Sequence, residues 1–164
     1  VGRPVMRILM VCTANICRSP TAEAVMRHRL GRAGLLDRIE LDSAGTRAGS
    51  TPMPADPRSI AHAARRGYDL TLLRSRPVTR LDFDRFDLIV PMDRSHVTQL
   101  TALVPGASPA QVRLLMSFVR ISGLSEEGPD PYYGGAAGFE HVLDLVELAC
   151  DGLLEYLYSP QGSR

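Results

Sequence analysis

Residues 5–11, with the sequence VMRILMV, and residues 12–20, with the sequence CTANICRSP, decide the fold. The first stretch is a short apolar run with the character of a buried strand. Ser19 and Pro20 form a favourable N-cap and first-turn pair, so a helix should begin directly after the loop. The start of the chain is therefore predicted to run from a strand through a short loop into a helix.

Apolar spacing and turn residues predict that strands and helices alternate along the rest of the chain. The prediction is a helix over 20–34, a strand over 39–42, a helix over 57–67, a strand over 88–92, a helix over 94–104, a strand over 112–116 and a helix over 139–158. Asp56 is expected to cap the second of these helices. This alternation implies a parallel sheet covered on both faces, with the functional site beyond the carboxyl ends of the strands, where Cys12 lies.

Length and composition set the class of protein. The chain has 164 residues, of which 45% are apolar and 23% charged, so one domain over 1–164 with a substantial core is expected. The formal net charge is only +1, which argues against a nucleic-acid-binding surface or a polybasic membrane anchor. No apolar run is long enough to span a bilayer. All 19 basic residues are Arg, which excludes lysine-based catalysis and favours bidentate recognition of anions.

The cysteines point to a reducing compartment. There are only three, Cys12, Cys17 and Cys150, and this small odd number argues against a disulfide scaffold and for a cytoplasmic location. No Cys/His pairs have the spacing of a zinc site, so neither a metal nor another cofactor is expected. Cys17 on its own is equally compatible with a small buried loop residue and with a redox partner of Cys12. Cys150 and the four histidines belong to no motif that we can defend.

The loop after the first strand has the features of an oxyanion cradle. A loop closing between a strand and a helix start turns backbone N–H groups inward, and Arg18 can grip two oxygens with its fork. The same surroundings favour the thiolate form of Cys12, the form that attacks phosphorus. Ser19 can donate a hydrogen bond to this sulfur, and Asn15 suits a left-handed position in the loop. The plain alternative is that Cys12 is an inert buried thiol.

A second motif, GPDPYYGG at residues 128–135, offers an acid. Phosphoryl transfer to sulfur requires protonation of the leaving oxygen, and Asp130 stands between two prolines that stiffen its loop. Tyr132 and Tyr133 could form an aromatic wall for a planar ring. The alternatives are an ordinary turn residue for Asp130 and rim packing for the two tyrosines.

Several motifs together resemble the low molecular weight protein tyrosine phosphatases over nearly the whole chain. They are residues 12–24 (CTANICRSPTAEA), 43–46 (SAGT), 56–58 (DPR), 92–95 (MDRS) and 130–135 (DPYYGG). The resemblance implies a single α/β domain with a four-stranded parallel sheet, helices on both faces and an N-terminal phosphate-binding loop. It also implies hydrolysis of protein phosphotyrosine through a phosphocysteine, binding of oxyanions such as phosphate, and no cofactor.

The resemblance also assigns roles to residues. Cys12 would be the nucleophile, Arg18 the phosphate clamp and Asp130 the general acid, and Cys17 could trap Cys12 as a reversible disulfide. The remaining roles are substrate binding and support of the loop. These would fall to Thr13, Ala14, Asn15, Ile16, Cys17, Ser19, Tyr132 and Tyr133, with Ser43 as a further support of the loop.

Three positions depart from the family pattern. Ala14 replaces a usual glycine, Gly49 stands where an aromatic residue usually walls the cleft, and Leu73 aligns with a histidine that supports the loop. These departures keep open the alternative of a phosphate-binding module with little turnover. A second alternative is an arsenate reductase coupled to a small thiol, in which Cys12 would attack arsenate in the same loop. The family pattern sets no oligomeric state and names no physiological substrate.

Overall fold

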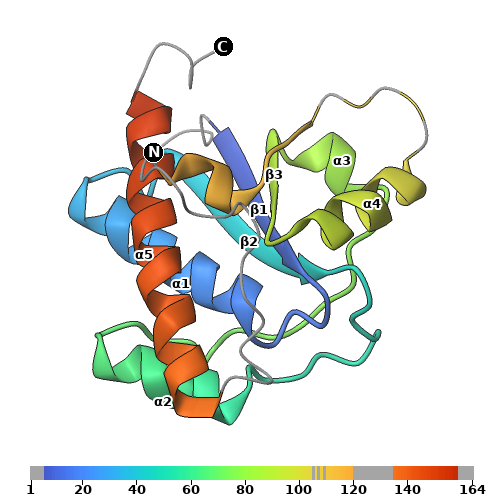
Figure 1. The fold of residues 1–164 in the computed structure, drawn as a ribbon. Coiled ribbons are helices and arrows are strands. Elements are labelled where there is room, and N and C mark those ends of the chain that lie inside the picture. The colour runs from blue at the N-terminus through green and yellow to red at the C-terminus, as the bar shows by residue number, and fades with distance from the viewer. Residues whose placement is uncertain (1–5, 105, 107, 109, 120–134, 159–164) are drawn as a thin grey trace.

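The structure, a computed structural model, describes residues 6–104, 106, 108, 110–119 and 135–158. Its strands are β1 (Met6–Cys12), β2 (Ile39–Gly45), β3 (Leu88–Pro91) and β4 (Gln111–Val112). Its helices are α1 (Arg18–Arg32), α2 (Pro57–Arg65), α3 (Asp82–Arg85), α4 (Arg94–Leu103), the 3₁₀ helix η1 (Leu115–Phe118) and α5 (Gly135–Tyr158). Figure 1 shows them arranged around a central sheet.

The described strands form a four-stranded sheet in the order β2-β1-β3-β4, and every neighbouring pair is parallel. The sheet expected from the sequence is thus confirmed. The chain leaves β1 toward β2 on one side and later returns to β3 on the other, so the strand order reverses at β1. Open parallel sheets bind ligands at such a reversal, beyond the carboxyl ends of the strands. Cys12, the last residue of β1, lies at this point.

Helices cover both faces of the sheet, and β1 shows why. Ile8 and Met10 pack into the larger core cluster with residues of α1 and α5. Leu9 and Val11 point to the opposite face and pack into a second cluster that includes Phe83. A strand buried on both faces reads as a continuous apolar run, as residues 5–11 do. Figure 1 shows α1 and α5 on one side of the sheet and α3 and α4 on the other.

The long helix α5 completes the larger cluster with one apolar face. Val142, Leu145, Val146, Ala149 and Leu153 are buried, as their helical spacing predicts. In the part of the chain that the structure describes, no helix is long and apolar enough to cross a membrane.

Three expectations about elements need correction. The fourth strand covers only Gln111–Val112, and residues 115–118 form η1 instead, because a short apolar run is equally compatible with a buried helical turn. Helix α1 begins at Arg18 with Cys17 as its N-cap, so Ser19 lies inside the helix and is not its cap. The short helix α3 was not predicted. By contrast, Asp56 does cap α2, accepting a hydrogen bond from the backbone of Arg58.

Candidate active site

Loop 13–17 connects the carboxyl end of β1 to the first turn of α1. The Cys12 side chain at its start is almost fully buried. The first N–H groups of a helix lack partners within the helix and carry partial positive charge, so this loop and helix start favour an anion. Within the loop, Asn15 and Cys17 are buried, whereas Thr13, Ala14 and Ile16 keep part of their surface exposed. The exposed part of the loop is where a ligand can approach.

A serine in the first turn of α1 contacts the Cys12 sulfur. Ser19 Oγ lies 3.0 Å from Cys12 Sγ, and both side chains are buried. Asn15 Nδ2 donates a hydrogen bond of 2.8 Å to the same Ser19 Oγ. Since an amide nitrogen can only donate, Ser19 accepts there and keeps its own hydrogen for the sulfur. A hydrogen bond in that direction stabilises a thiolate.

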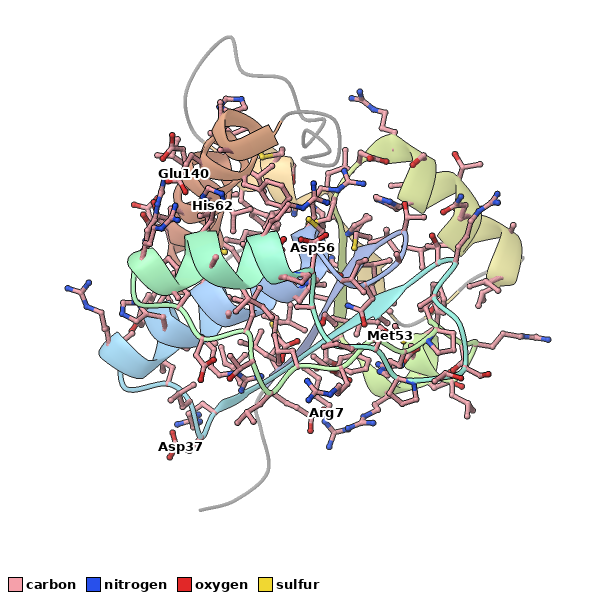
Figure 2. All side chains as sticks on the ribbon, turned by 90° about the horizontal axis from the view of Figure 1, so that it is seen from below. Arg7, Asp37, Met53, Asp56, His62 and Glu140 are labelled. Carbon is pink, nitrogen blue, oxygen red and sulfur yellow. The ribbon has the colours of Figure 1, made fainter. Side chains whose placement is uncertain are left out.

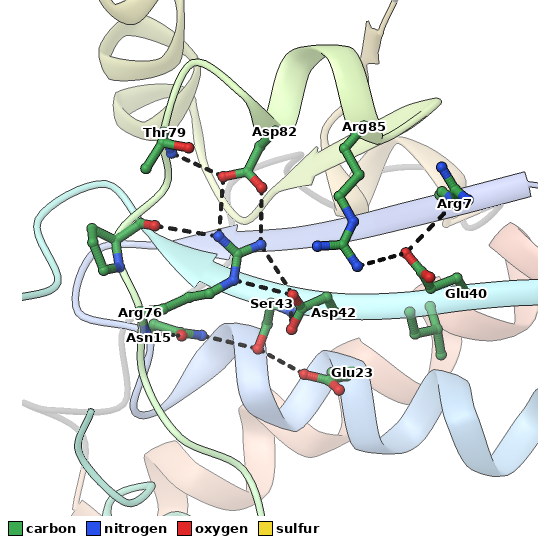
Figure 3. A network of polar contacts seen from close by, with 12 residues as sticks. Arg7, Asn15, Glu23, Glu40, Asp42, Ser43, Arg76, Thr79, Asp82 and Arg85 are labelled. Carbon is green, nitrogen blue, oxygen red and sulfur yellow. Dashed lines mark hydrogen bonds and ion pairs between the residues drawn. The ribbon is translucent and has the colours of Figure 1, made fainter. Parts of the chain in front are cut away.

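Asn15 holds the loop in shape through its backbone and its side chain (Figure 3). Its φ is 60°, and no other non-glycine residue in the described ranges has a positive φ. Its Nδ2 also donates to Ser43 Oγ at 3.0 Å, and its Oδ1 accepts from the backbone N–H of Arg76 at 3.0 Å. Side-chain contacts thus tie the left-handed turn to α1, to β2 and to the segment before α3.

The hydrogen-bond chain continues to a buried acid, Glu23, for which the sequence analysis proposed no role. Ser43 Oγ donates to Glu23 Oε1 at 2.7 Å, and Arg27 Nη2 donates to Glu23 Oε2 at 2.6 Å. Burial raises the pKa of Glu23, although the hydrogen bonds from Ser43 and Arg27 act in the opposite direction. A continuous polar path therefore runs from Glu23 through Ser43, Asn15 and Ser19 to Cys12. Figure 3 shows its first part, from Glu23 through Ser43 to Asn15.

Arg18 is oriented by an aspartate from the other face of the sheet. Its Nη1 donates to Asp93 Oδ2 at 2.9 Å, and both side chains are mostly buried. Burial alone would raise the pKa of Asp93, but the hydrogen bonds from Ser95 and Arg18 outweigh it and lower that pKa. Asp93 is therefore ionised at neutral pH. Because a guanidinium presents its donors in a rigid fork, fixing one nitrogen orients the others.

Helix α2 supports the outer side of the loop. The backbone N–H of Asp56 donates to Ile16 O at 2.7 Å, and Cys17 Sγ lies 3.0 Å from Ser59 Oγ. His62, one turn further along α2, is hydrogen-bonded to Glu140 of α5, and Figure 2 shows the two side by side. All three cysteines are free thiols.

On the β2 side the loop touches backbone directly. The N–H groups of Thr46 and Arg47 donate to Cys12 O and Thr13 O, each at 2.9 Å. A Cβ added at Gly45 would lie 2.5 Å from Thr13 O, closer than any carbon can approach. Only glycine fits at position 45 while the loop keeps this position.

The three departures from the family pattern have little effect on the loop's geometry. Ala14 does not occupy a left-handed position, so its methyl group carries no such strain. Leu73 packs against the core, and the backbone of Arg76 bonds to Asn15. Gly49 leaves open space, since an added Cβ would meet no heavy atom within 4 Å. Position 49 thus contributes no aromatic wall beside the loop.

Some expected site residues cannot be placed. Asp130, Tyr132 and Tyr133 lie outside the described residues. Asp93 and His96, in contrast, were missed as site residues, although the motif MDRS was noticed. The sequence signals a capping box there, an aspartate followed three residues later by a side chain that can cap in return, but it does not signal the contact with the loop. Among the described residues, no group of His, Cys, Asp and Glu could hold a metal ion.

The α/β fold, with a cysteine loop at its strand-order reversal, has the geometry that favours an anion, and comparisons with known proteins identify the family. Residues 7–161 match the sequence model described as low molecular weight phosphotyrosine protein phosphatase. The chain belongs to this family. It is 46% identical, over 90% of its length and 91% of the relative's, to a low molecular weight protein-tyrosine-phosphatase of Streptomyces coelicolor.

Solved structures agree with this assignment. The crystal structure of YfkJ from Bacillus subtilis has a TM-score of 0.87 and 33% identity, covering 96% of this chain and 98% of that one. The crystal structure of a product-state mimic of a protein tyrosine phosphatase from Entamoeba histolytica has a TM-score of 0.86 and 37% identity. It covers 93% of this chain and 96% of that one.

Proposed function

We propose that this chain is a cysteine-dependent protein-tyrosine phosphatase with Cys12 as its nucleophile. The observation that carries the proposal is the contact between Cys12 Sγ and Ser19 Oγ at the start of α1, beside the Arg18–Asp93 pair. A sulfur held there can attack phosphorus while loop amides and a guanidinium bind the other oxygens. The relatives named above as phosphatases favour this function over arsenate reduction or binding without turnover.

In the first step, the Cys12 thiolate attacks the phosphorus of a phosphotyrosine side chain. The S–P bond forms, the bond from phosphorus to the phenolic oxygen breaks, and its electron pair stays on that oxygen. Asp130 gives the oxygen a proton, so that tyrosine leaves as a neutral phenol.

In the second step, water attacks the phosphocysteine. Ionised Asp130 takes a proton from the water, the S–P bond breaks and inorganic phosphate is released. Ser19 donates its hydrogen bond to the sulfur as it leaves with the electron pair. The step regenerates both the Cys12 thiolate and protonated Asp130, and it uses no metal or other cofactor.

The loop and Arg18 bind the three equatorial oxygens through both steps. The amides of Thr13, Ala14, Asn15, Ile16 and Cys17 supply the fixed donors. Arg18 supplies a forked donor that Asp93 holds in place. Donors positioned before the reaction stabilise the charge that develops on these oxygens without reorganising.

The proposed substrate is a phosphotyrosine protein. Tyr132 and Tyr133 are proposed to contact the aromatic ring. Gly49 supplies no aromatic wall, and the space around it is open. Aryl phosphates and inorganic oxyanions should bind the same loop. We further propose that the whole of residues 1–164 forms one domain and that the protein acts in the cytoplasm, which cell fractionation can test.

Cys17 is proposed to protect the nucleophile from irreversible oxidation. Hydrogen peroxide converts the Cys12 thiolate to a sulfenic acid, and the Cys17 thiol then attacks this sulfur. The disulfide bond forms as water leaves, and an external thiol reduces it.

The decisive experiment compares rates on a phosphotyrosine peptide, a phosphoserine peptide and arsenate with a thiol. Phosphotyrosine should be hydrolysed fastest, and Cys12→Ser should abolish turnover while still binding phosphate or vanadate. Cys150→Ala, at a buried cysteine in the core, is the matched control and should keep its turnover. Turnover retained by Cys12→Ser would refute the nucleophile, and arsenate loss exceeding hydrolysis would favour the reductase.

The general acid is tested through the leaving group. Asp130→Asn should slow aryl phosphates with poor leaving groups far more than activated ones, because only the former need a proton. An equal loss on both kinds of substrate would remove Asp130 from this role.

A further inference from the structure

A buried histidine connects the two sides of the phosphate loop. His96 is the third residue of α4 and its side chain is fully buried. The backbone N–H of Asp93 donates to His96 Nδ1 at 3.1 Å, and His96 Nε2 lies 2.9 Å from Thr13 Oγ1. One ring nitrogen therefore contacts the N-cap residue of α4, and the other contacts loop 13–17.

These partners fix the tautomer of a neutral ring. Both the backbone N–H and the carboxylate of Asp93 lie near Nδ1, with Oδ1 at 3.3 Å. In a neutral ring, the hydrogen bond from the shorter contact, the N–H at 3.1 Å, makes Nδ1 an acceptor, and the ring proton belongs on Nε2. Nε2 is then a donor and Thr13 Oγ1 its acceptor. The tautomer follows from the arrangement of hydrogen-bond partners.

Each partner of His96 stands next to a residue of the proposed chemistry. Thr13 directly follows Cys12 in the chain. Asp93 holds Arg18 through an ion pair of 2.9 Å. By accepting the Asp93 N–H, His96 completes the capping box that sets the backbone from which the Asp93 carboxylate extends.

We propose that His96 is a positioning residue for phosphoryl transfer. It holds the Asp93–Arg18 pair at a fixed position relative to loop 13–17, which directly follows Cys12. The proposal rests on the roles given above to Cys12 and Arg18. The transition state depends on donors that lie at fixed positions, and an ångström of misplacement can cost about 100-fold in rate. Loss of His96 should therefore lower kcat more than it changes KM.

Two substitutions at this position separate positioning from packing. His96→Leu fills a similar volume but removes both hydrogen bonds. His96→Gln can rescue both, because its Oε1 can accept from the Asp93 N–H, as glutamine does in capping boxes, and its Nε2 can donate to Thr13. We expect kcat on p-nitrophenyl phosphate to fall about 10-fold or more in His96→Leu. KM should change by less than about 3-fold, and His96→Gln should recover most of the lost kcat.

The matched control is Leu100→Ala, a buried position on the same helix that packs into the second core cluster. It should lower stability while its folded fraction keeps the wild-type kcat. An equal loss of kcat in this control, a His96→Leu enzyme with wild-type kcat, or a folded His96→Gln enzyme without recovery would each overturn the proposal.

Two further measurements keep the test decisive. If His96→Leu does not fold, Thr13→Val removes the same loop contact from the other partner, and wild-type kcat in that variant would equally overturn the proposal. Turnover by Cys12→Ser would instead refute the proposed nucleophile, so the two failures are distinguishable.

Discussion

Replacing Asn15 should separate the two ways in which this residue shapes the phosphate loop. Its side chain makes three hydrogen bonds, to Ser19, Ser43 and the backbone of Arg76, and its backbone adopts a φ of 60°. Asn15→Gly removes the hydrogen bonds but tolerates the left-handed backbone. Asn15→Ala removes the same bonds and adds a Cβ that this conformation disfavours.

The structure sets the expected magnitudes. Three hydrogen bonds at about 1 kcal/mol each give a loss of about 3 kcal/mol in the free energy of unfolding for either variant. Alanine at a left-handed position should cost about 1 kcal/mol more than glycine. The Asn15→Ala variant should thus lose about 4 kcal/mol, a large part of the about 5–15 kcal/mol that stabilises a typical domain.

Urea unfolding of Asn15→Gly, Asn15→Ala and Gly34→Ala measures these losses in the free energy of unfolding. Gly34→Ala is the matched control, because Gly34 has a φ of 73° and an added Cβ there would meet no heavy atom within 4 Å. Its loss reports the cost of alanine in a left-handed conformation without new contacts. The difference between Asn15→Ala and Asn15→Gly should equal that loss, since both comparisons replace glycine by alanine in the same backbone region.

Two results would refute this reasoning. If Asn15→Gly unfolds at the wild-type urea concentration, the side-chain network does not hold the loop. If Asn15→Ala and Asn15→Gly have equal stability while Gly34→Ala is destabilised, the left-handed conformation of Asn15 is not retained in solution. A turnover assay on the same samples should show a loss of kcat in both Asn15 variants.

Three further predictions concern the rim, the redox chemistry and acid stability. Gly49→Tyr should lower KM for aryl phosphates several-fold by restoring an aromatic wall, and a KM equal to that of Gly49→Ala would contradict this. Cys17→Ala should lose the recovery of activity by thiol after peroxide treatment; equal recovery would exclude a Cys12–Cys17 disulfide. The hydrogen bond from Arg58 lowers the pKa of Asp56, so the stabilisation is present above the unfolded pKa of about 3.9 and is lost as pH falls through the folded value. Asp56→Asn should therefore be less stable than wild type by under about 1 kcal/mol at neutral pH and equal to it in strong acid, by urea unfolding; a constant difference would refute the assignment.

The sequence was most informative where a local rule agrees with the tertiary environment. The apolar run at β1 is buried on both faces, and Asp56 caps α2 as its position before Pro57 predicts. The prediction failed at residues 112–116, where an apolar run becomes η1 because it packs under α5. Local spacing cannot distinguish a short buried strand from a buried helical turn.

For the site, the sequence indicated the loop but not what surrounds it. Cys12 and Arg18 stand out because they are close in the chain and follow a strand. Asp93 and His96 reach the loop from α4, some 75 residues beyond Arg18, and no local pattern records that contact. Ser19 was predicted both as a helix cap and as a hydrogen-bond partner of the Cys12 sulfur. The helix begins earlier, so the cap prediction is wrong, whereas the hydroxyl does lie 3.0 Å from the sulfur.

The close approach at Gly45 has a consequence for how this protein can vary. Main chain packs against main chain where β2 meets loop 13–17, so a side chain at position 45 would push the loop away from β2. An added Cβ at position 49, by contrast, would meet no heavy atom within 4 Å, so this position can change without moving the loop. Of these two glycines, one is therefore fixed by the backbone of the loop, and the other leaves room for any side chain.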